Sequence, residues 1–343
     1  MKKTLLFILS TLMGVALFIG VLHRIGIHEI LETLRSFSWA TLALIMLVGF
    51  LQLTVVLYRW QMVLRAQGDT VPLKKLFVPK LIGYAVSFIT PGPYVGGEPV
   101  QAYVLKKETG VRFTHGLAAI IVDKLLDFTY PLPFLIGALV YVMMKFDVSS
   151  EVFSLFAVVL LALIVVLALF YIMTYQGKGF ISVLLIVFRI NRITYIKKYF
   201  EKLLYFEKLI IQFFQHRSGV FIKGLLLSLL SGALVFIQLF LLLHAMGIIA
   251  NPWHIFIIMV FMILAFIMPI PGALGTMEAG QALIFNAMGY TASAGVVFAF
   301  IFRIIELVKV GLGLIFLSSV GLNFLRNLND LTNGGQANSK EQD

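Results

Sequence analysis

The sequence predicts an all-α polytopic membrane protein with about six spanning helices and two re-entrant helical hairpins, about eight hydrophobic segments in all, arranged as an inverted repeat. Three observations lead to this prediction. Hydrophobic residues make up 60% of the 343 residues and charged residues only 13%, against about 25% in an average soluble domain. The mean hydropathy is +1.00. A Pro-Gly step followed by Glu also occurs twice, at positions 91–98 and again at positions 271–278, each time within a long apolar stretch.

The charge pattern and the absence of certain motifs exclude several classes of function. The net charge is +11, but the Lys and Arg residues lie between apolar runs and so indicate membrane orientation and contact with anionic lipid, not nucleic acid. The chain has no Cys, which excludes a disulfide framework and a thiolate metal site. His115, His244 and His254 lack the spacing of metal ligands, and no nucleotide loop or nucleophile motif occurs. We expect no metal, no cofactor and no enzymatic activity.

The first half of the chain is predicted to begin in the cytoplasm. Residues 4–22 predict a spanning helix, and no signal-peptide cleavage site follows it, so the helix is expected to be retained. Residues 39–58 predict the second span. The loop from Arg59 to Lys75 holds four basic residues and one acid, which places it on the cytoplasmic side.

The next apolar stretch, residues 76–90, is too short to cross the membrane comfortably and ends at a Pro-Gly step. A basic segment follows, so the chain both enters and returns on the cytoplasmic side. Residues 76–105 therefore predict a re-entrant helical hairpin with Pro91 and Gly92 at its tip, packed in protein or lining a wet cavity. Residues 113–145 carry charges at membrane depth, and the pattern leaves open whether they form one tilted helix or two shorter ones.

The second half follows a similar plan. Residues 176–223 are basic and interleaved with aromatic side chains, which predicts an amphipathic segment that binds anionic lipid on the cytoplasmic leaflet. A second short apolar stretch ends at Pro271 and Gly272, the expected tip of the second hairpin. Residues 1–322 are expected to form a single transmembrane domain in the cell (inner) membrane, with both termini cytoplasmic, and residues 323–343 a disordered polar tail. The remaining predicted spans are residues 152–175, 224–246 and 291–317.

The two hairpins belong to an internal repeat. When Glu98 is aligned with Glu278, Gln101 falls on Gln281, and after a one-residue deletion two basic-x-x-acidic pairs align as well. The loop before the first hairpin is basic, whereas its counterpart holds no charge, so the positive-inside rule places them on opposite sides. Inverted repeats with discontinuous helices are a transporter arrangement, with the site at the repeat interface near the midplane. The repeat units cover about residues 40–145 and 220–320.

The two Glu residues are the first candidates for the site. A carboxylate at membrane depth could neutralise a cationic head group or take up a proton during transport. Alternatively, Glu98 and Glu278 cap the amide groups of the helices that start after the Pro-Gly breaks. One residue can serve both roles.

The second candidates are two i,i+3 pairs, Lys124 with Asp127 and Arg303 with Glu306, each on one helix face. Each is either a neutralising ion pair that lets its helix insert, or a source of cations that hold a lipid phosphate. Lys309 either pairs with Glu306 or extends to the interface. The candidate substrate-binding residues are Glu98, Glu278, Lys124, Arg303, Asp123, Asp127, Glu306, Gln101 and Gln281, with Pro91, Gly92, Pro271 and Gly272 as hairpin tips.

Several motifs also carry a family resemblance: Thr90-Pro91-Gly92, Gly97-Glu98, Gln101-Ala102-Tyr103, Val122 to Asp127, and Ile270 to Ala279. With these motifs the chain resembles the lysylphosphatidylglycerol synthase transmembrane-region family, also called the flippase-like domain family, over about residues 5–320. In the larger members this domain is thought to flip aminoacylated phospholipid that a soluble C-terminal domain makes. The resemblance implies a stand-alone flippase-like domain here, without lysyl transfer. Lys124 stands where the family more commonly has Arg.

We therefore expect a carrier that moves a phospholipid or lipid-linked head group between leaflets by alternating access. Two alternatives stay open. One is a membrane enzyme that acts on lipid head groups with Glu98 or Asp123 as general base. The other is a membrane partner whose basic segment recruits a separate, soluble lipid-modifying synthase.

Overall fold

The computed structural model describes residues 37–90, 96–129, 131–145, 150–180, 182–183, 194–216 and 218–337, together with Ile19 and Glu32. Almost all of the predicted first span and the first hairpin tip, Pro91 and Gly92, lie outside these residues. All the elements of the described part are helical: α3 (Trp39–Ala66), α4 (Leu73–Ile89), α5 (Glu98–Thr109), α6 (Phe113–Thr129), α7 (Leu132–Lys145), α8 (Ser150–Tyr175), α10 (Thr194–His216), α11 (Ser218–Ala245), α12 (Pro252–Ile267), the 3₁₀ turn η2 (Pro271–Ala273), α13 (Thr276–Ala287) and α14 (Ala292–Ala337).

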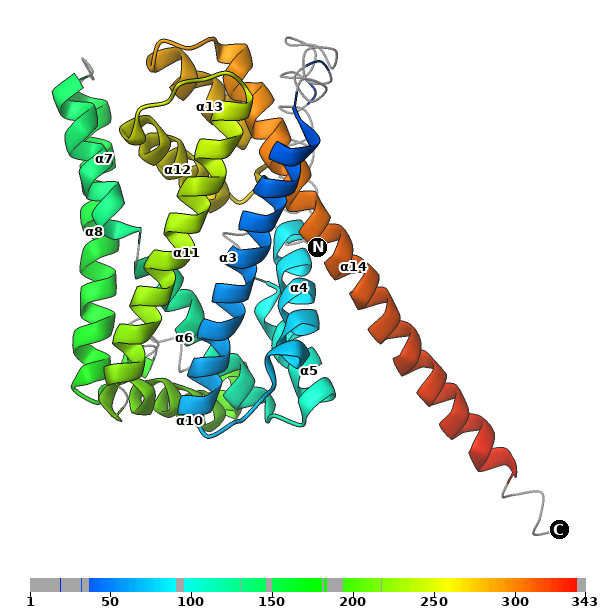
Figure 1. Cartoon of the computed structure of the whole chain (residues 1–343). Helices are drawn as coiled ribbons and strands as arrows, with labels where there is room; N and C mark the ends of the chain where they lie inside the picture. The colour runs from blue at the N-terminus through cyan, green and yellow to red at the C-terminus, as the bar shows by residue number, and fades with distance from the viewer. Residues whose placement is uncertain are drawn as a thin grey trace.

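Two helices of the described part are long and apolar enough to cross a membrane, Trp39–Ala66 and Gly219–Ala245. They are α3 and most of α11, each helix has 28 residues, and the two run side by side (Figure 1). Each of these two helices is followed by a pair of short helices and then by one more helix. After α3 these are α4, α5 and α6, and after α11 they are α12, α13 and α14.

The two pairs of short helices approach each other from opposite sides of the molecule. The start of α4 and the end of α5, which we call the outer ends of this pair, lie on the side of the molecule where α10 is (Figure 1). The start of α12 and the end of α13, the outer ends of the second pair, lie on the opposite side. Their inner ends meet, because α4 contacts η2 between α12 and α13. A Cβ added at Gly272 would lie 2.7 Å from the ring of Phe88 near the end of α4.

Glycine residues in left-handed backbone conformations form these inner ends. Gly96 before α5 has a φ of 140°, Gly272 in η2 a φ of 57°, and Gly275 before α13 a φ of 76°. Such φ values favour Gly because it lacks a Cβ. The backbone therefore turns sharply there, and Glu98 and Glu278 fall in the first turn of the helix that follows.

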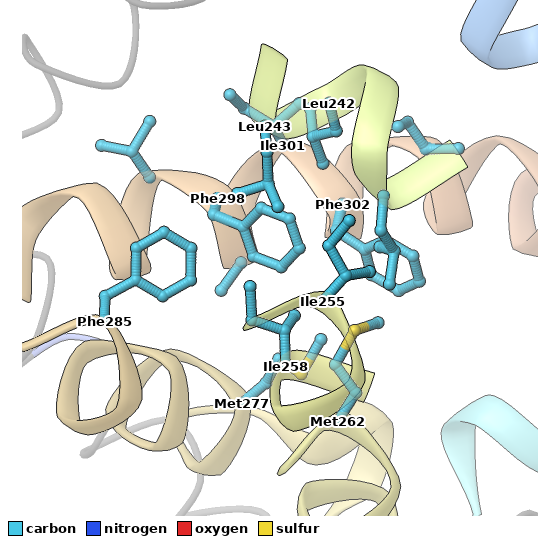
Figure 2. Close-up of a cluster of buried hydrophobic side chains, with 14 of the residues drawn as sticks. Leu242, Leu243, Ile255, Ile258, Met262, Met277, Phe285, Phe298, Ile301 and Phe302 are labelled. Carbon is cyan, nitrogen blue, oxygen red and sulfur yellow. The ribbon is translucent and has the colours of Figure 1, made fainter. Parts of the chain in front are cut away.

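Two apolar cores hold the helices. The first lies mainly between α11, α12, α13 and α14, where the rings of Phe285 and Phe298 are fully buried against aliphatic side chains from the neighbouring helices (Figure 2). The second lies mainly between α3, α4, α5, α6 and α10 and includes the buried indole of Trp60. Each pair of short helices is thus anchored to a different core.

The amphipathic helix α10 lies across the ends of the longer helices (Figure 1). Ile210 and Phe213 on one of its faces are buried in the second core. Its Tyr205 hydroxyl lies 3.3 Å from Nε2 of His115 on α6, and Nδ1 of the same ring lies 2.8 Å from Asp69 in the α3–α4 loop. A polar bridge therefore joins α10 to the base of the first pair of short helices.

The helix bounds decide one choice that the sequence left open and differ from one prediction. The stretch at residues 113–145 forms two helices, α6 and α7, because Pro131 between them has no N–H to continue the backbone hydrogen bonds. Conversely, α14 continues to Ala337, past the predicted end at residue 317 and through most of the tail that we expected to be disordered. No Pro follows Pro271 in the sequence, so none interrupts the hydrogen bonds of this helix.

Candidate functional site

Glu98, the first residue of α5, is 5% exposed and makes two kinds of contact. Its Oε2 accepts a hydrogen bond of 2.7 Å from the N–H of Gly96. Its Oε1 forms an ion pair with the ammonium of Lys124 on α6. The next amide, Gly97 N–H, donates to Ser87 Oγ on α4 at 3.1 Å. The carboxylate thus caps the interrupted backbone and pairs with a cation at the same time.

Glu278, in the first turn of α13, is fully buried and repeats this arrangement. Its Oε2 accepts a hydrogen bond of 2.8 Å from Gly275 N–H, and its Oε1 lies 2.7 Å from Nε of Arg303 on α14. Arg303 also donates from Nη1 to the Gly272 carbonyl at 2.7 Å and from Nη2 to the Ala273 carbonyl at 3.2 Å. The guanidinium therefore satisfies both the carboxylate and the carbonyls of the turn before α13.

A second network surrounds Arg59, which is fully buried on α3. Its Nε lies 2.6 Å from Asp123 Oδ1 and its Nη1 lies 2.5 Å from Asp127 Oδ1, both on α6. Nη1 also donates to Ser228 Oγ on α11 at 2.7 Å. One guanidinium therefore ties together the two long helices and α6.

Lys80 on α4 completes this network. Its Nζ lies 2.9 Å from Asp123 Oδ2 and 5.8 Å from the centre of the Trp60 ring, close enough for a cation–π interaction. Both carboxylate oxygens of Asp123 are consequently held by cations.

The two halves are joined by Tyr84 on α4 and Glu306 on α14. The Tyr84 hydroxyl donates a short hydrogen bond to Glu306 Oε2, and Lys309 Nζ lies 2.5 Å from Glu306 Oε1. Lys309 Nζ also lies 5.5 Å from the centre of the Tyr84 ring. A little further along, a Cβ added at Gly313 would collide with the Leu81 carbonyl oxygen, so the backbones of α4 and α14 are in close contact.

The predicted glutamines lie at close helix contacts within each half. Gln101 is 5% exposed, and its Cβ would be 2.7 Å from a Cβ added at Gly83 on α4. Gln281 is fully buried, and its Nε2 donates a hydrogen bond to the Ile258 carbonyl at 3.4 Å. The backbone carbonyl oxygen of Gln281 would collide with a Cβ added at Gly295. We therefore place these two residues at the packing of the short helices.

The structure changes the partners predicted for the charged pairs. Lys124 pairs with Glu98 on α5, and Asp127 pairs with Arg59 on α3, so these ion pairs join α6 to two other helices. In the second half, Arg303 pairs with Glu278 in the same way. The alternative in which Lys309 pairs with Glu306 is confirmed. Of the predicted hairpin tips, Pro271 and Gly272 form η2.

Sequence reasoning missed three members of the site. Arg59 was assigned to a cytoplasmic loop, but α3 continues to Ala66 and keeps this residue inside the helix bundle. Lys80 and Tyr84 lie one turn apart on α4, within a segment read only as a short apolar stretch. The sequence could have identified Lys80 as a candidate site residue, because a Lys inside an apolar segment is energetically costly unless it is paired.

Within the described residues, these contacts join five cations to five carboxylates. Three of each belong to the first half and two of each to the second. Buried charges of this kind need partners, because an isolated ion in a medium of low polarity is unstable. Ion pairs that join separate helices can also exchange a partner for a charged ligand, and each exchange would loosen one helix contact.

The helices of the described residues, two of them long and apolar enough to cross a membrane, and the paired charges between them fit a helical membrane protein. The family model of the lysylphosphatidylglycerol synthase transmembrane region matches residues 6–313, and the chain belongs to this family. It is 24% identical to a UPF0104 membrane protein of Pyrococcus horikoshii, over 89% of this chain and 93% of the relative. It is 26% identical to a UPF0104 membrane protein of Methanothermobacter thermautotrophicus, over 79% of this chain and 82% of the relative.

A further UPF0104 membrane protein of Methanothermobacter thermautotrophicus is 30% identical to the chain over 158 residues, which is 46% of each protein. No solved structure matches the chain. The names of these relatives describe membrane proteins, in agreement with a membrane location.

Proposed function

We propose that this protein is a carrier that moves a phospholipid or a lipid-linked head group between the leaflets of the cell (inner) membrane by alternating access. The observation that carries the proposal is the pair of matching contacts of Glu98 and Glu278. Each carboxylate holds the start of a short helix and pairs with a cation on the next helix. Both lie near the inner ends of the two helix pairs, where a head group would pass.

The proposal includes an inverted repeat, and the helix bounds support it. In the alignment that places Glu98 on Glu278, α3 corresponds to α11, α4 to α12, α5 to α13 and α6 to the first part of α14. The helices α5 and α13 each have 12 residues. In Figure 1 the chain runs through these matching helices in opposite directions. Two re-entrant hairpins inserted from opposite sides would place the site near the midplane.

In this mechanism, the polar head group passes between the two helix pairs while the acyl chains stay in lipid. The head group would compete for the ion pairs, which join α5 to α6 and α13 to α14. The same charged residues hold these helices against each other. Binding of a head group would therefore break some of the contacts between α5 and α6 or between α13 and α14. A transporter needs such a coupling between ligand binding and helix position.

The experiment is a flip assay on the full chain reconstituted in liposomes, with Glu98→Gln, Glu278→Gln and the double variant. We expect each single variant to slow lipid movement at least about tenfold, the change expected for losing roughly one charged interaction. Glu108→Gln is the matched control, because Glu108 is an exposed residue of the same helix as Glu98. Wild-type rates in all three site variants would remove these carboxylates from the mechanism. A chemically new lipid in the same vesicles would support the alternative of an enzyme.

A further inference from the structure

The ion pairs of the site are not equally accessible on their two sides. The side chain of Lys80 is 19% exposed against 1% for Asp123. Lys124 is 24% exposed against 6% for Glu98, and Lys309 is 24% exposed against 8% for Glu306. In all three pairs the lysine side chain is more exposed than the side chain of its acidic partner.

An incoming head group would therefore meet lysines first. A phosphate can accept hydrogen bonds from an ammonium while the buried carboxylate keeps its place behind it, since a Lys has three N–H donors. A cationic head group would have to displace each Lys before it could reach the carboxylate. The pair of Arg59 and Asp127 is the reverse: the Arg59 side chain is 0% exposed and the Asp127 side chain 39%, so in this pair the carboxylate is the more exposed member.

Two of the three lysines, Lys80 and Lys309, are linked across the two halves through Tyr84. Lys80 and Tyr84 lie one turn apart on α4, and the Tyr84 ring carries Lys309 from α14 at 5.5 Å. Lys80 also pairs with Asp123 on α6, whereas Lys124, the next residue of that helix, pairs with Glu98 on α5. Aromatic rings contact two of the ammonium groups: Trp60 contacts Lys80, and Tyr84 contacts Lys309. A cation–π contact of this kind stabilises an ammonium without neutralising its charge.

We infer that Lys80, Lys124 and Lys309 bind the phosphate of an anionic lipid head group, and that the site disfavours head groups with net positive charge. This inference rests on the proposed lipid transport and names its substrate class. Arg59 offers a further hydrogen-bond donor for a phosphate oxygen, because its Nη2 is buried and has no acceptor among the described residues.

The test measures binding and transport separately, on the full chain. Binding of phosphatidylglycerol, phosphatidic acid and lysylphosphatidylglycerol to the detergent-solubilised protein would be compared by native mass spectrometry. We expect the two anionic lipids to bind at least about tenfold more tightly than the cationic one, the size of one charge-assisted contact. Equal binding of all three, or preference for the lysyl lipid, would overturn the inference even if lipids are transported. Selective anionic binding without any flipping would instead overturn the proposed transport and leave the lipid class standing.

Two variants locate the effect. Lys80→Gln should weaken phosphatidylglycerol binding about tenfold, whereas Lys75→Gln, at an exposed position of the same helix, should leave it unchanged. Lys80→Arg keeps the charge and should retain anionic preference, which separates a loss of binding from a loss of folding. Lys309→Glu should reverse the order of the anionic and lysyl lipids. An unchanged order in Lys309→Glu together with normal binding in Lys80→Gln would place the phosphate elsewhere.

Discussion

Glu98 and Glu278 occupy equivalent positions in the two halves of the chain and make the same two contacts. Each accepts a backbone N–H from a glycine two or three residues earlier, at 2.7 Å and 2.8 Å. Each also pairs with a cation on the following helix. Both carboxylates hold a glycine N–H at the backbone break, as the capping interpretation expects, and both also pair with a cation of the protein. A substitution at either Glu will therefore disturb helix position and charge together.

The two cations of these pairs are not equivalent, and this difference can be measured. Arg303 serves a carboxylate and two carbonyl groups, and an ammonium cannot reproduce that planar set of donors. We expect Arg303→Lys to lower the free energy of unfolding by about 2 kcal/mol, seen as a lower midpoint of thermal unfolding in detergent. The reciprocal change Lys124→Arg should cost less than about 1 kcal/mol. Equal losses would contradict the contacts assigned to Arg303.

Arg59 should be the most sensitive cation of the helix bundle. Arg59→Met would leave Asp127 and Asp123 without the guanidinium that both contact, and breaking a buried ion pair from one side costs roughly 3–5 kcal/mol. We expect poor yield or a strongly lowered unfolding midpoint. Arg65→Met is the control, because Arg65 is an exposed residue in the last turn of the same helix. Similar stability of the two variants would show that the buried network contributes little.

The close contact between α4 and α14 can be tested with two glycines of one helix. Gly313→Val should destabilise the protein by about 1–3 kcal/mol, since its new side chain would meet the Leu81 carbonyl and Ala85. Gly311→Val is the control, because it changes the helix propensity of α14 in the same way as Gly313→Val. Nothing lies within 4 Å of a Cβ added at Gly311. The difference between the two variants, measured by thermal unfolding, isolates the helix contact. No difference would mean that α4 and α14 do not touch at this point.

The inverted arrangement predicts opposite exposure of two loops. Thr70 precedes the first short helix pair, Ile249 precedes the second, and both side chains are exposed. The chain has no Cys, so Thr70→Cys and Ile249→Cys each provide a single thiol for labelling in intact cells with a reagent that does not cross the membrane. We expect only the second thiol to react from outside. Equal reactivity of both thiols would rule out the inverted repeat.

The sequence was sufficient to find charged residues that lie in apolar segments, where a charge is unusual. A Glu after a Pro-Gly break in an apolar segment is costly, and its recurrence at one spacing identified Glu98 and Glu278. Their partners could not be found in this way, because Lys124 and Glu98 meet only when α5 and α6 fold against each other. Spacing along a helix pointed instead to pairs within α6 and α14.

Helix ends were the other source of error. The prediction ended the second span at residue 58, just before Arg59, since basic residues usually mark the membrane surface. In the structure α3 continues for two more turns, and the guanidinium is neutralised by acids on α6 that no local pattern connects to it. By contrast, Pro131 provides a local reason for the break between α6 and α7, which is a choice that the sequence left open.

The balance of charges within each half has an electrical consequence. With all ten groups ionised, the three cations of the first half match its three carboxylates, and the two cations of the second half match its two. In the proposed carrier, these ten groups would then contribute no net charge to the reorientation of the empty form, whereas an anionic head group would add one negative charge. Membrane voltage contributes about 2.3 kcal/mol per charge at 100 mV. In a cell that is negative inside, the voltage would therefore favour outward movement of the lipid and leave the return of the empty carrier unaffected.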